Sequence, residues 1–228
     1  MATLTWLGHA AFRIDTDGGT RIYVDPFLQN NPKTPDAEKL PERVDIIAVT
    51  HGHFDHAGEV PGLSKSFPDA QIVAQVEVKS WLGKQGANVG ELPGINKGGT
   101  QEIGGVRFTL TNAAHSSSSE QGEYLGESCG LVFRFDGASI YFAGDTCVFG
   151  DMALIARLYE PDVAVLPIGD WFTMGPTEAA LALELLGNPR CVPSHWGTFG
   201  LLTGTPDALA GLTTAHVEKL EPGESIEL

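Results

Sequence analysis

Short apolar segments recur along the whole chain and are separated by turn residues or by longer amphipathic stretches. Nine of them have the length and the Val, Ile, Phe and Tyr content that are typical of β-strands. They are TLTWLG at 3–8, TRIYVD at 20–25, VDIIAVT at 44–50, AQIVAQ at 70–75, VRFTLTNA at 106–113, GLVFRFD at 130–136, SIYFAGD at 139–145, VAVLPIG at 163–169 and CVPSHW at 191–196. Several are apolar on both faces, which predicts strands that are covered on each side.

Two longer stretches between these strands have the pattern of helices. Residues 151–161 begin with Asp151 in a capping position. Residues 175–187 have Pro176 in the first turn and Gly187 just past the end, which is the usual arrangement of these two residue types around a helix. We therefore predict a helix in each stretch.

Other strand segments follow one another with only a turn between them. Asp136-Gly137 separates two apolar segments and predicts a hairpin turn, because both residue types tolerate the positive φ angles that such turns require. Hairpins alternating with helical connections indicate mixed sheets with helices packed outside them.

Polar side chains of the kind that bind metals follow six of the predicted strands. They are His9, Asp25, His51, His115, Asp145 and His195. In sheets with helical crossovers, ligands bind outside the carboxyl ends of the strands, so we expect these side chains to gather at one site. His216 has no such place in the pattern and is predicted to lie on the surface.

The segment THGHFDHAGE at 50–59 adds three more candidate ligands to this set. His51 and His53 alternate along an extended segment, so both can bind one ion. Asp55 and His56 are adjacent, at the point where the chain is expected to enter a helix, and they point differently. A second ion is the simplest explanation for them. Imidazole and carboxylate ligands without thiolate suit zinc, manganese or iron in an open catalytic site.

Composition narrows the classes of protein that fit this pattern. A length of 228 residues with 42% hydrophobic residues suits one folded domain over 1–228. The formal charge of −15, from 14 basic against 29 acidic residues, argues against a nucleic-acid partner. Three cysteines without a C-x-x-C pair, no signal sequence and no long apolar run predict a cytoplasmic protein that makes no membrane contact.

The metal-ligand pattern resembles that of the metallo-β-lactamase superfamily. His51-x-His53-x-Asp55-His56 is similar to its H-x-H-x-D-H motif, and His115, Asp145, His195 and Asp25 resemble its other motifs. Residues 6–12, 25–32, 166–180 and 195–206 look like those of small metal-dependent hydrolases related to ascorbate-phosphate lactonase. This resemblance spans nearly the whole chain and implies an αββα sandwich, with two mixed sheets face to face and helices outside.

The resemblance also implies a dinuclear mechanism. One ion would be held by His51, His53 and His115, the other by Asp55, His56 and His195, with Asp145 bridging them. A hydroxide shared by the ions would attack a carbonyl carbon or a phosphorus atom. Asp55 would orient the hydroxide or carry its proton.

Two further residues are assigned supporting roles. Asp25 is expected to act as an outer-shell partner that orients a ligating imidazole. His9 follows Gly8 in a predicted tight bend, and we expect it to donate a hydrogen bond to the substrate.

The same pattern leaves the substrate and the native metal open. The first interpretation is a hydrolase of a small ester, lactone or phosphodiester that uses two divalent ions, zinc or manganese, with iron also compatible. An iron-dependent oxidoreductase of the dioxygenase or diiron type is an alternative, although the diiron type tends to replace a motif histidine and His53 is retained. A non-catalytic metal-binding protein is the third. A homo-oligomer, with the loop 29–42 at an interface, is also compatible with the sequence.

Three stretches are expected to shape the pocket. Phe54 and Asp170-Trp171 depart from the residues common in the similar hydrolases, and both departures are expected to change its shape. The segment 172–180 contains a helix N-terminus, where backbone N–H groups favour anions. The polar segment 116–128 is expected to form a mobile rim.

Overall fold

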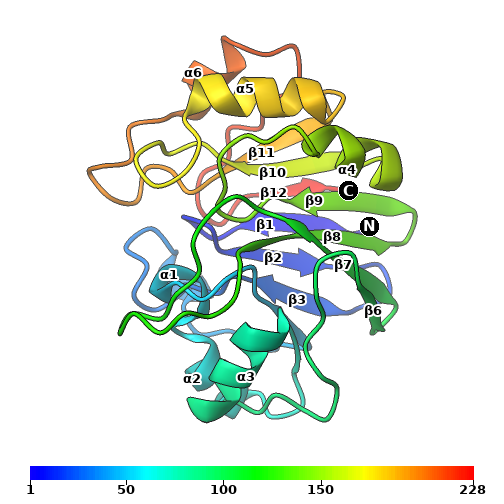
Figure 1. Ribbon diagram of the computed structural model, residues 1–228, viewed down its shortest axis with the longest axis vertical. Coiled ribbons are helices and arrows are strands. Elements are labelled where there is room, and N and C mark those ends of the chain that lie inside the picture. Colours follow the sequence, from blue (N-terminus) through cyan, green and yellow to red (C-terminus); the bar gives the residue numbers. More distant parts are fainter.

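Two six-stranded sheets face each other in the computed structural model, which describes residues 1–228 (Figure 1). The first sheet has the order β12-β1-β2-β3-β4-β5. Its strands are β1 (Thr3–Trp6), β2 (Phe12–Asp15), β3 (Arg21–Val24), β4 (Ile46–Ala48), β5 (Gln71–Val73) and β12 (Ser225–Glu227). The second sheet has the order β11-β10-β9-β8-β7-β6. Its strands are β6 (Thr100–Ile103), β7 (Val106–Asn112), β8 (Cys129–Phe135), β9 (Ala138–Phe142), β10 (Val163–Pro167) and β11 (Arg190–Ser194).

Helices cover the outer face of each sheet (Figure 1). The helices beside the first sheet are α1 (Phe54–Ala57), α2 (Val60–Ser66) and α3 (Val76–Lys84), and those beside the second are α4 (Met152–Tyr159), α5 (Pro176–Leu185) and α6 (Pro206–Ala210). A 3-10 turn, η1 (Asp36–Glu38), lies in the loop after β3. The predicted αββα sandwich is confirmed. None of the helices combines the length and the apolar character needed to cross a bilayer.

Three apolar clusters hold the four layers together. The largest lies between the sheets, where Phe12 of the first sheet meets Phe142 of the second with ring centroids 5.4 Å apart. A second cluster joins the first sheet to α2 and α3 around Trp81, and a third joins the second sheet to α4 and α5 around Tyr141 and Leu183. Because both faces of each sheet are covered, the central strands are apolar on both sides, as the sequence indicated.

The strands that precede the predicted ligands run in one direction within each sheet. In the first sheet, β3 and β4 are parallel, and β1 has the same direction because it is antiparallel to β2, which is antiparallel to β3. In the second sheet, β7 and β9 are both antiparallel to β8, and β9, β10 and β11 are parallel. Their carboxyl ends therefore open at the same edge of each sheet, where crossover folds bind ligands.

The structure confirms the nine predicted strands, both predicted helices and the hairpin turn. Asp136 and Gly137 have φ angles of 50° and 85° between β8 and β9, as that turn requires. Asp151 occupies the N-cap position of α4, but its side chain makes no capping hydrogen bond. His216 is exposed and pairs with Glu218, as expected for a surface residue.

Three strands were missed, and each has a physical reason. β6 is an edge strand whose side chains are all exposed or half-buried, so it has no apolar pattern. β12 is only 3 residues long and pairs with β1 at the other end of the chain. β2 does alternate between buried and half-buried positions, and its FRID sequence carried a signal that could have been used.

A close backbone approach between β10 and β11 makes one glycine essential to this edge of the sheet. A Cβ atom on Gly169 would overlap the carbonyl oxygen of His195. We expect Gly169→Ala to lower the free energy of unfolding by roughly 1–3 kcal/mol, because the overlap forces the backbone apart. Urea denaturation monitored by circular dichroism measures this change.

Gly62 provides the matched control, since it lies in α2 with open space around its Cα. There, Gly62→Ala is expected to raise the free energy of unfolding by up to about 1 kcal/mol through helix propensity. Equal stabilities for Gly169→Ala and the unmodified protein would show that β10 and β11 have room for a methyl group after all.

Candidate metal centre

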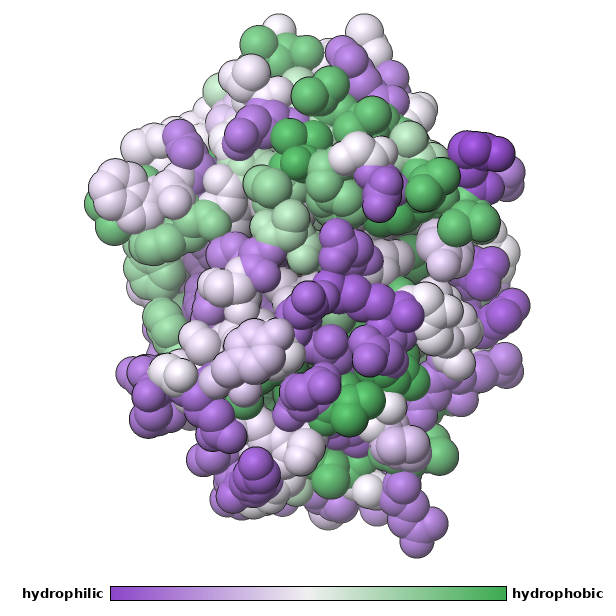
Figure 2. All heavy atoms as spheres, in the orientation of Figure 1, coloured by the Kyte–Doolittle hydropathy of each residue, from purple (hydrophilic) through white to green (hydrophobic).

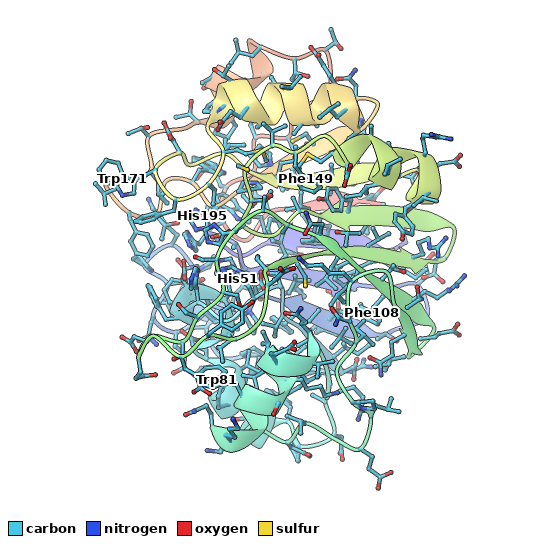
Figure 3. The ribbon with its side chains drawn as sticks, in the orientation of Figure 1. His51, Trp81, Phe108, Phe149, Trp171 and His195 are labelled. Carbon is cyan, nitrogen blue, oxygen red and sulfur yellow. The ribbon has the colours of Figure 1, made fainter.

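The predicted ligands meet at the edge where the strands end. His51 and His53 lie in the connection from β4 to α1, and Asp55 and His56 lie in α1 itself. His115, Asp145 and His195 follow β7, β9 and β11. Figure 3 shows His51 and His195 close to each other at this edge, one from each sheet. His51, Asp145 and His195 are 0%, 3% and 2% exposed, so the group is largely removed from water.

Three imidazoles form the first group of candidate ligands. His51 Nε2 lies 3.0 Å from His53 Nδ1, which lies 3.3 Å from His115 Nε2. Nitrogens that share a tetrahedral ion at about 2.0–2.1 Å are roughly 3.3 Å apart, so the three atoms are spaced as ligands of one ion would be. This observation supports the expected pairing of His51 with His53 and brings in His115 from the opposite sheet.

The protonation of His51 is set by its neighbour Thr50. The hydroxyl of Thr50 donates to Asp25 Oδ2 at 2.6 Å. The oxygen of this Thr50 hydroxyl, Oγ1, also lies 3.0 Å from His51 Nδ1. Since the hydroxyl proton is already used, Nδ1 of His51 must be the donor in the second contact. The lone pair of His51 Nε2 therefore points at the site, in the form that binds a metal ion.

Asp55, His56 and His195 form the second group. The Asp55 carboxylate oxygen Oδ2 lies 3.7 Å from His195 Nε2 and 3.8 Å from His56 Nε2. His56 donates from Nδ1 to Asp25 at 2.8 Å, whereas its Nε2 is buried and has no hydrogen-bond partner. Buried polar atoms without partners are rare in proteins, so the unpartnered Nε2 fits a ligand of a second ion, which would bind it in place of its proton.

Asp145 lies between the two groups. Its Oδ2 atom is 3.6 Å from His115 Nε2 and 3.9 Å from His51 Nε2 on one side. On the other side it is 3.4 Å from His56 Nε2 and 3.2 Å from His195 Nε2. One carboxylate oxygen thus faces nitrogens of both groups, which is the placement expected of a bridging ligand.

The electrostatics of the metal-free site favour ionised carboxylates beside two protonated imidazoles. Burial disfavours the charge of Asp145, but His195 and His56 outweigh it and hold its pKa well below the usual value. Burial also opposes protonation of His195, yet the carboxylate of Asp145, and after it that of Asp55, stabilise the protonated ring and raise the His195 pKa to about 9. The same balance, dominated after burial by Asp145 and Asp25, raises the pKa of His56.

His9 is placed behind Asp55 and does not line the open cavity. Its ring is 0% exposed, with Nε2 2.9 Å from Asp55 Oδ2 and Nδ1 3.1 Å from Thr198 Oγ1. Burial and the neighbouring His195 lower the pKa of His9 to about 4. The neutral ring must donate from Nε2 to the carboxylate, which leaves Nδ1 as an acceptor facing the Thr198 hydroxyl; that hydroxyl also lies 3.3 Å from the Trp196 carbonyl oxygen.

This geometry differs from the expectation that His9 faces the substrate, because residue 9 has a φ of 56° that turns its ring inward. Thr198 is a site residue that the sequence analysis missed. Its signal was its position in the HWGTFG segment, three residues after His195.

Asp25 also contacts the ligands from behind. It accepts hydrogen bonds from the Thr50 backbone N–H at 2.8 Å, from the Thr50 hydroxyl and from His56 Nδ1. It touches no cavity surface and orients a candidate ligand through its ring N–H, as expected of an outer-shell partner.

A cavity of about 450 Å³ opens above the candidate ligands. Its floor consists of His53, Asp55, His115, Asp145 and His195, and its walls include Phe54, Phe172, Phe199, Leu201 and Ser116. Of the polar segment 116–128, Ser116 reaches the cavity, while Ser117 is buried and hydrogen-bonds to the Leu125 carbonyl at 3.3 Å. Cys147 is exposed and lies outside the cavity lining.

Comparison with known proteins identifies the family. Residues 20–196 match the family described as the beta-lactamase superfamily domain. Metal-dependent hydrolases of Herpetosiphon aurantiacus and Rubrobacter xylanophilus are each 46% identical to the chain, over 98% of its length and 96% and 95% of theirs. A metallo hydrolase of Ignicoccus hospitalis has a similar structure, with a TM-score of 0.84 and 33% identity over 100% of this chain and 99% of that one. The chain therefore belongs to the metallo-β-lactamase superfamily and is one of its metal-dependent hydrolases.

Proposed function

We propose that this hydrolase uses two divalent ions to cleave a small ester or lactone. The observation that carries the proposal is the position of Asp145, whose Oδ2 lies 3.2–3.9 Å from imidazole nitrogens of both ligand groups. His51, His53 and His115 would hold one ion, and Asp55, His56 and His195 the other. Bound divalent ions lower the pKa of water and stabilise the negative charge that develops on a carbonyl oxygen.

Asp55 is proposed to accept and transfer the proton of the attacking water. Burial raises the pKa of Asp55, but the neighbouring rings of His56, His195 and His9 outweigh burial, lower this pKa and keep the carboxylate ionised. Because Asp55 also lines the cavity, it can accept the water proton and pass it to the leaving oxygen. The water oxygen bonds to the carbonyl carbon, the acyl C–O bond breaks, and an acid and an alcohol result. In a lactone both groups remain on one molecule.

His9 is proposed as a positioning residue for this carboxylate. Its Nε2–H donates to Asp55 at 2.9 Å, and Thr198 fixes the tautomer from the other side of the ring. Asp25 is proposed to fix the tautomer of His56 in the same way. Both hydrogen bonds are buried, so water does not compete for their donors and acceptors.

The donor set suits zinc or manganese, and also iron. We further propose that the partner is a small molecule, not a nucleic acid, since the chain has a formal charge of −15. Three free cysteines favour a reducing, cytoplasmic compartment, which cell fractionation would test.

Removal of one ligand should distinguish the two proposed metal sites. We expect the unmodified protein to bind two equivalents of zinc or manganese, and His195→Ala to bind about one and to lose at least about 100-fold in kcat/KM on esters or lactones. Metal analysis by mass spectrometry after dialysis, together with hydrolysis assays, measures both quantities.

His216→Ala is the matched control, because it removes an exposed histidine that pairs only with Glu218. It should keep both equivalents and full turnover. Full metal content in His195→Ala would refute the second site. Oxygen consumption by the iron-loaded protein, without hydrolysis, would favour the oxidoreductase alternative.

The hydrogen bonds from Asp25 to His56 and from His9 to Asp55 can be tested without removing a metal ligand. In Asp25→Asn, an amide that keeps its oxygen toward the Thr50 backbone N–H turns its NH2 group toward His56 and the Thr50 hydroxyl. This group forces the wrong tautomer of His56 and should weaken metal binding about 10–100-fold. His9→Leu should lower kcat, and His9→Gln, which retains a donor near Asp55, should restore part of it. Asp136→Asn, in the distant hairpin turn, serves as the control for Asp25→Asn.

Metal binding should release protons at neutral pH. Because the His195 pKa is about 9 and the carboxylates of Asp145 and Asp25 raise the His56 pKa well above its usual value, both rings carry a proton that a bound ion must displace. We expect release of about two protons at pH 7 and fewer above pH 9, with affinity falling as the pH falls. Calorimetric titrations in buffers of different ionisation enthalpy measure the number. Binding at pH 7 without proton release would contradict this charge distribution.

A further inference from the structure

The walls of the cavity are apolar in a way that the chemistry of its floor does not require. Phe54, Phe172 and Leu201 are 51%, 49% and 47% exposed, although large apolar side chains are usually buried. All three border the same cavity of about 450 Å³, a volume typical of small-molecule sites. Figure 2 shows apolar side chains along the left margin, the side on which Figure 3 places Trp171 and His195. Apolar side chains gathered around a hollow indicate a binding surface.

Phe54 and a further wall residue, Phe199, are held in place by buried aromatic partners. The ring of Phe54, at the start of α1, packs edge-on against Phe27 with centroids 6.0 Å apart. Phe199 packs edge-on against the His9 ring at 5.2 Å. Phe27 and His9 are 4% and 0% exposed, so they anchor the walls to the protein interior. The apolar surface is therefore formed before a ligand binds, which lowers the entropy cost of binding.

The loop that carries Phe172 adopts a strained backbone conformation. Asp170 and Trp171 have φ angles of 65° and 60°, a region that residues other than glycine rarely adopt. Hydrogen bonds from Asp170 N to the Met174 carbonyl at 3.0 Å and from Phe172 N to the Asp170 carbonyl at 2.7 Å hold the loop in this shape. The loop directs Phe172 into the cavity and leaves Trp171 68% exposed beside it. Strain of this kind tends to persist at functional sites.

The apolar walls around the floor of the cavity offer no partner to a charged substituent of the substrate. No lysine or arginine lines the cavity. The N-terminus of α5 is a place where an anion is expected to bind. The carboxylate of Glu178 lies there and accepts a hydrogen bond from Gly175 N at 3.2 Å. A phosphate or carboxylate on the substrate would lose water at these apolar walls without gaining a partner.

We propose that the substrate is a neutral ester or lactone that carries an apolar chain or an aromatic ring, and that this group binds between Phe54, Phe172 and Leu201. The proposal rests on the hydrolytic function above and narrows its substrate class. It excludes phosphorylated and other anionic small molecules as preferred substrates.

A homologous series of substrates tests the proposal. With p-nitrophenyl esters from acetate to octanoate, or lactones with side chains of increasing length, we expect kcat/KM to rise about two- to fourfold per methylene until the cavity is filled. Phe172→Ala and Leu201→Ala, which each remove an apolar side chain from the cavity walls, should each reduce this slope. Leu158→Ala is the control, because Leu158 is an exposed leucine on α4 outside the cavity. It should leave the slope unchanged.

A binding measurement keeps the inference distinct from the proposed reaction. Calorimetric titration of the metal-loaded protein with straight-chain carboxylates, which resemble products, should show affinity rising with chain length by a similar factor. That slope should fall in Phe172→Ala even if no ester is cleaved. Equal affinity across the series, or better turnover of phosphorylated analogues than of neutral ones, would overturn the proposal. Absence of hydrolysis alone would count against the proposed function and not against the apolar site.

Discussion

Three carboxylates are buried at one edge of the sandwich, and the need to stabilise their charges determines how the site is built. Asp25, Asp55 and Asp145 are 2%, 9% and 3% exposed. An ionised carboxylate away from water is unstable unless it is paired or accepts hydrogen bonds. Asp25 is satisfied by Thr50 and His56, Asp55 is satisfied by His9, and Asp145 faces four imidazoles. The histidines that would bind ions therefore also neutralise the carboxylates, so the site is organised before metal enters it.

This arrangement requires backbone conformations that are unfavourable in isolation. His9, Asp25 and His195 have φ angles of 56°, 45° and 54°, at a cost of roughly 1–3 kcal/mol each. Backbone hydrogen bonds compensate: His195 N donates to the His9 carbonyl at 2.9 Å, and Asp25 N donates to the Ala48 carbonyl at 2.9 Å. The Trp6 indole also donates to the His9 carbonyl at 2.9 Å. The strain lies where side chains must be aimed, and the sheets supply the stability that permits it.

The sequence predicted the strands and the meeting of the ligands because both depend on repeating local signals. Apolar strands ending in His51, His115, Asp145 or His195 could converge only if those strands shared a direction, and they do. The inward turn of His9 could not be foreseen, because a positive φ at a histidine has no local signature. The partner of His9, Thr198, is 189 residues away. Phe54 and the segment 172–180 were expected to shape the pocket, but the apolar character of its walls was not, since Phe54, Phe172 and Leu201 lie far apart in the sequence and resemble ordinary core residues there.

The division of the ligands between the two sheets has a consequence for how the protein comes apart. Residues 51–56 belong to the first sheet, whereas His115, Asp145 and His195 belong to the second. Any ion bound here would join segments of the two sheets that lie at least 62 positions apart in the sequence, and would act as a removable cross-link between the two halves. Such a cross-link forms only after the two halves have docked, so it slows unfolding more than it speeds folding. The lifetime of the native state would then depend on the metal supply of the cell.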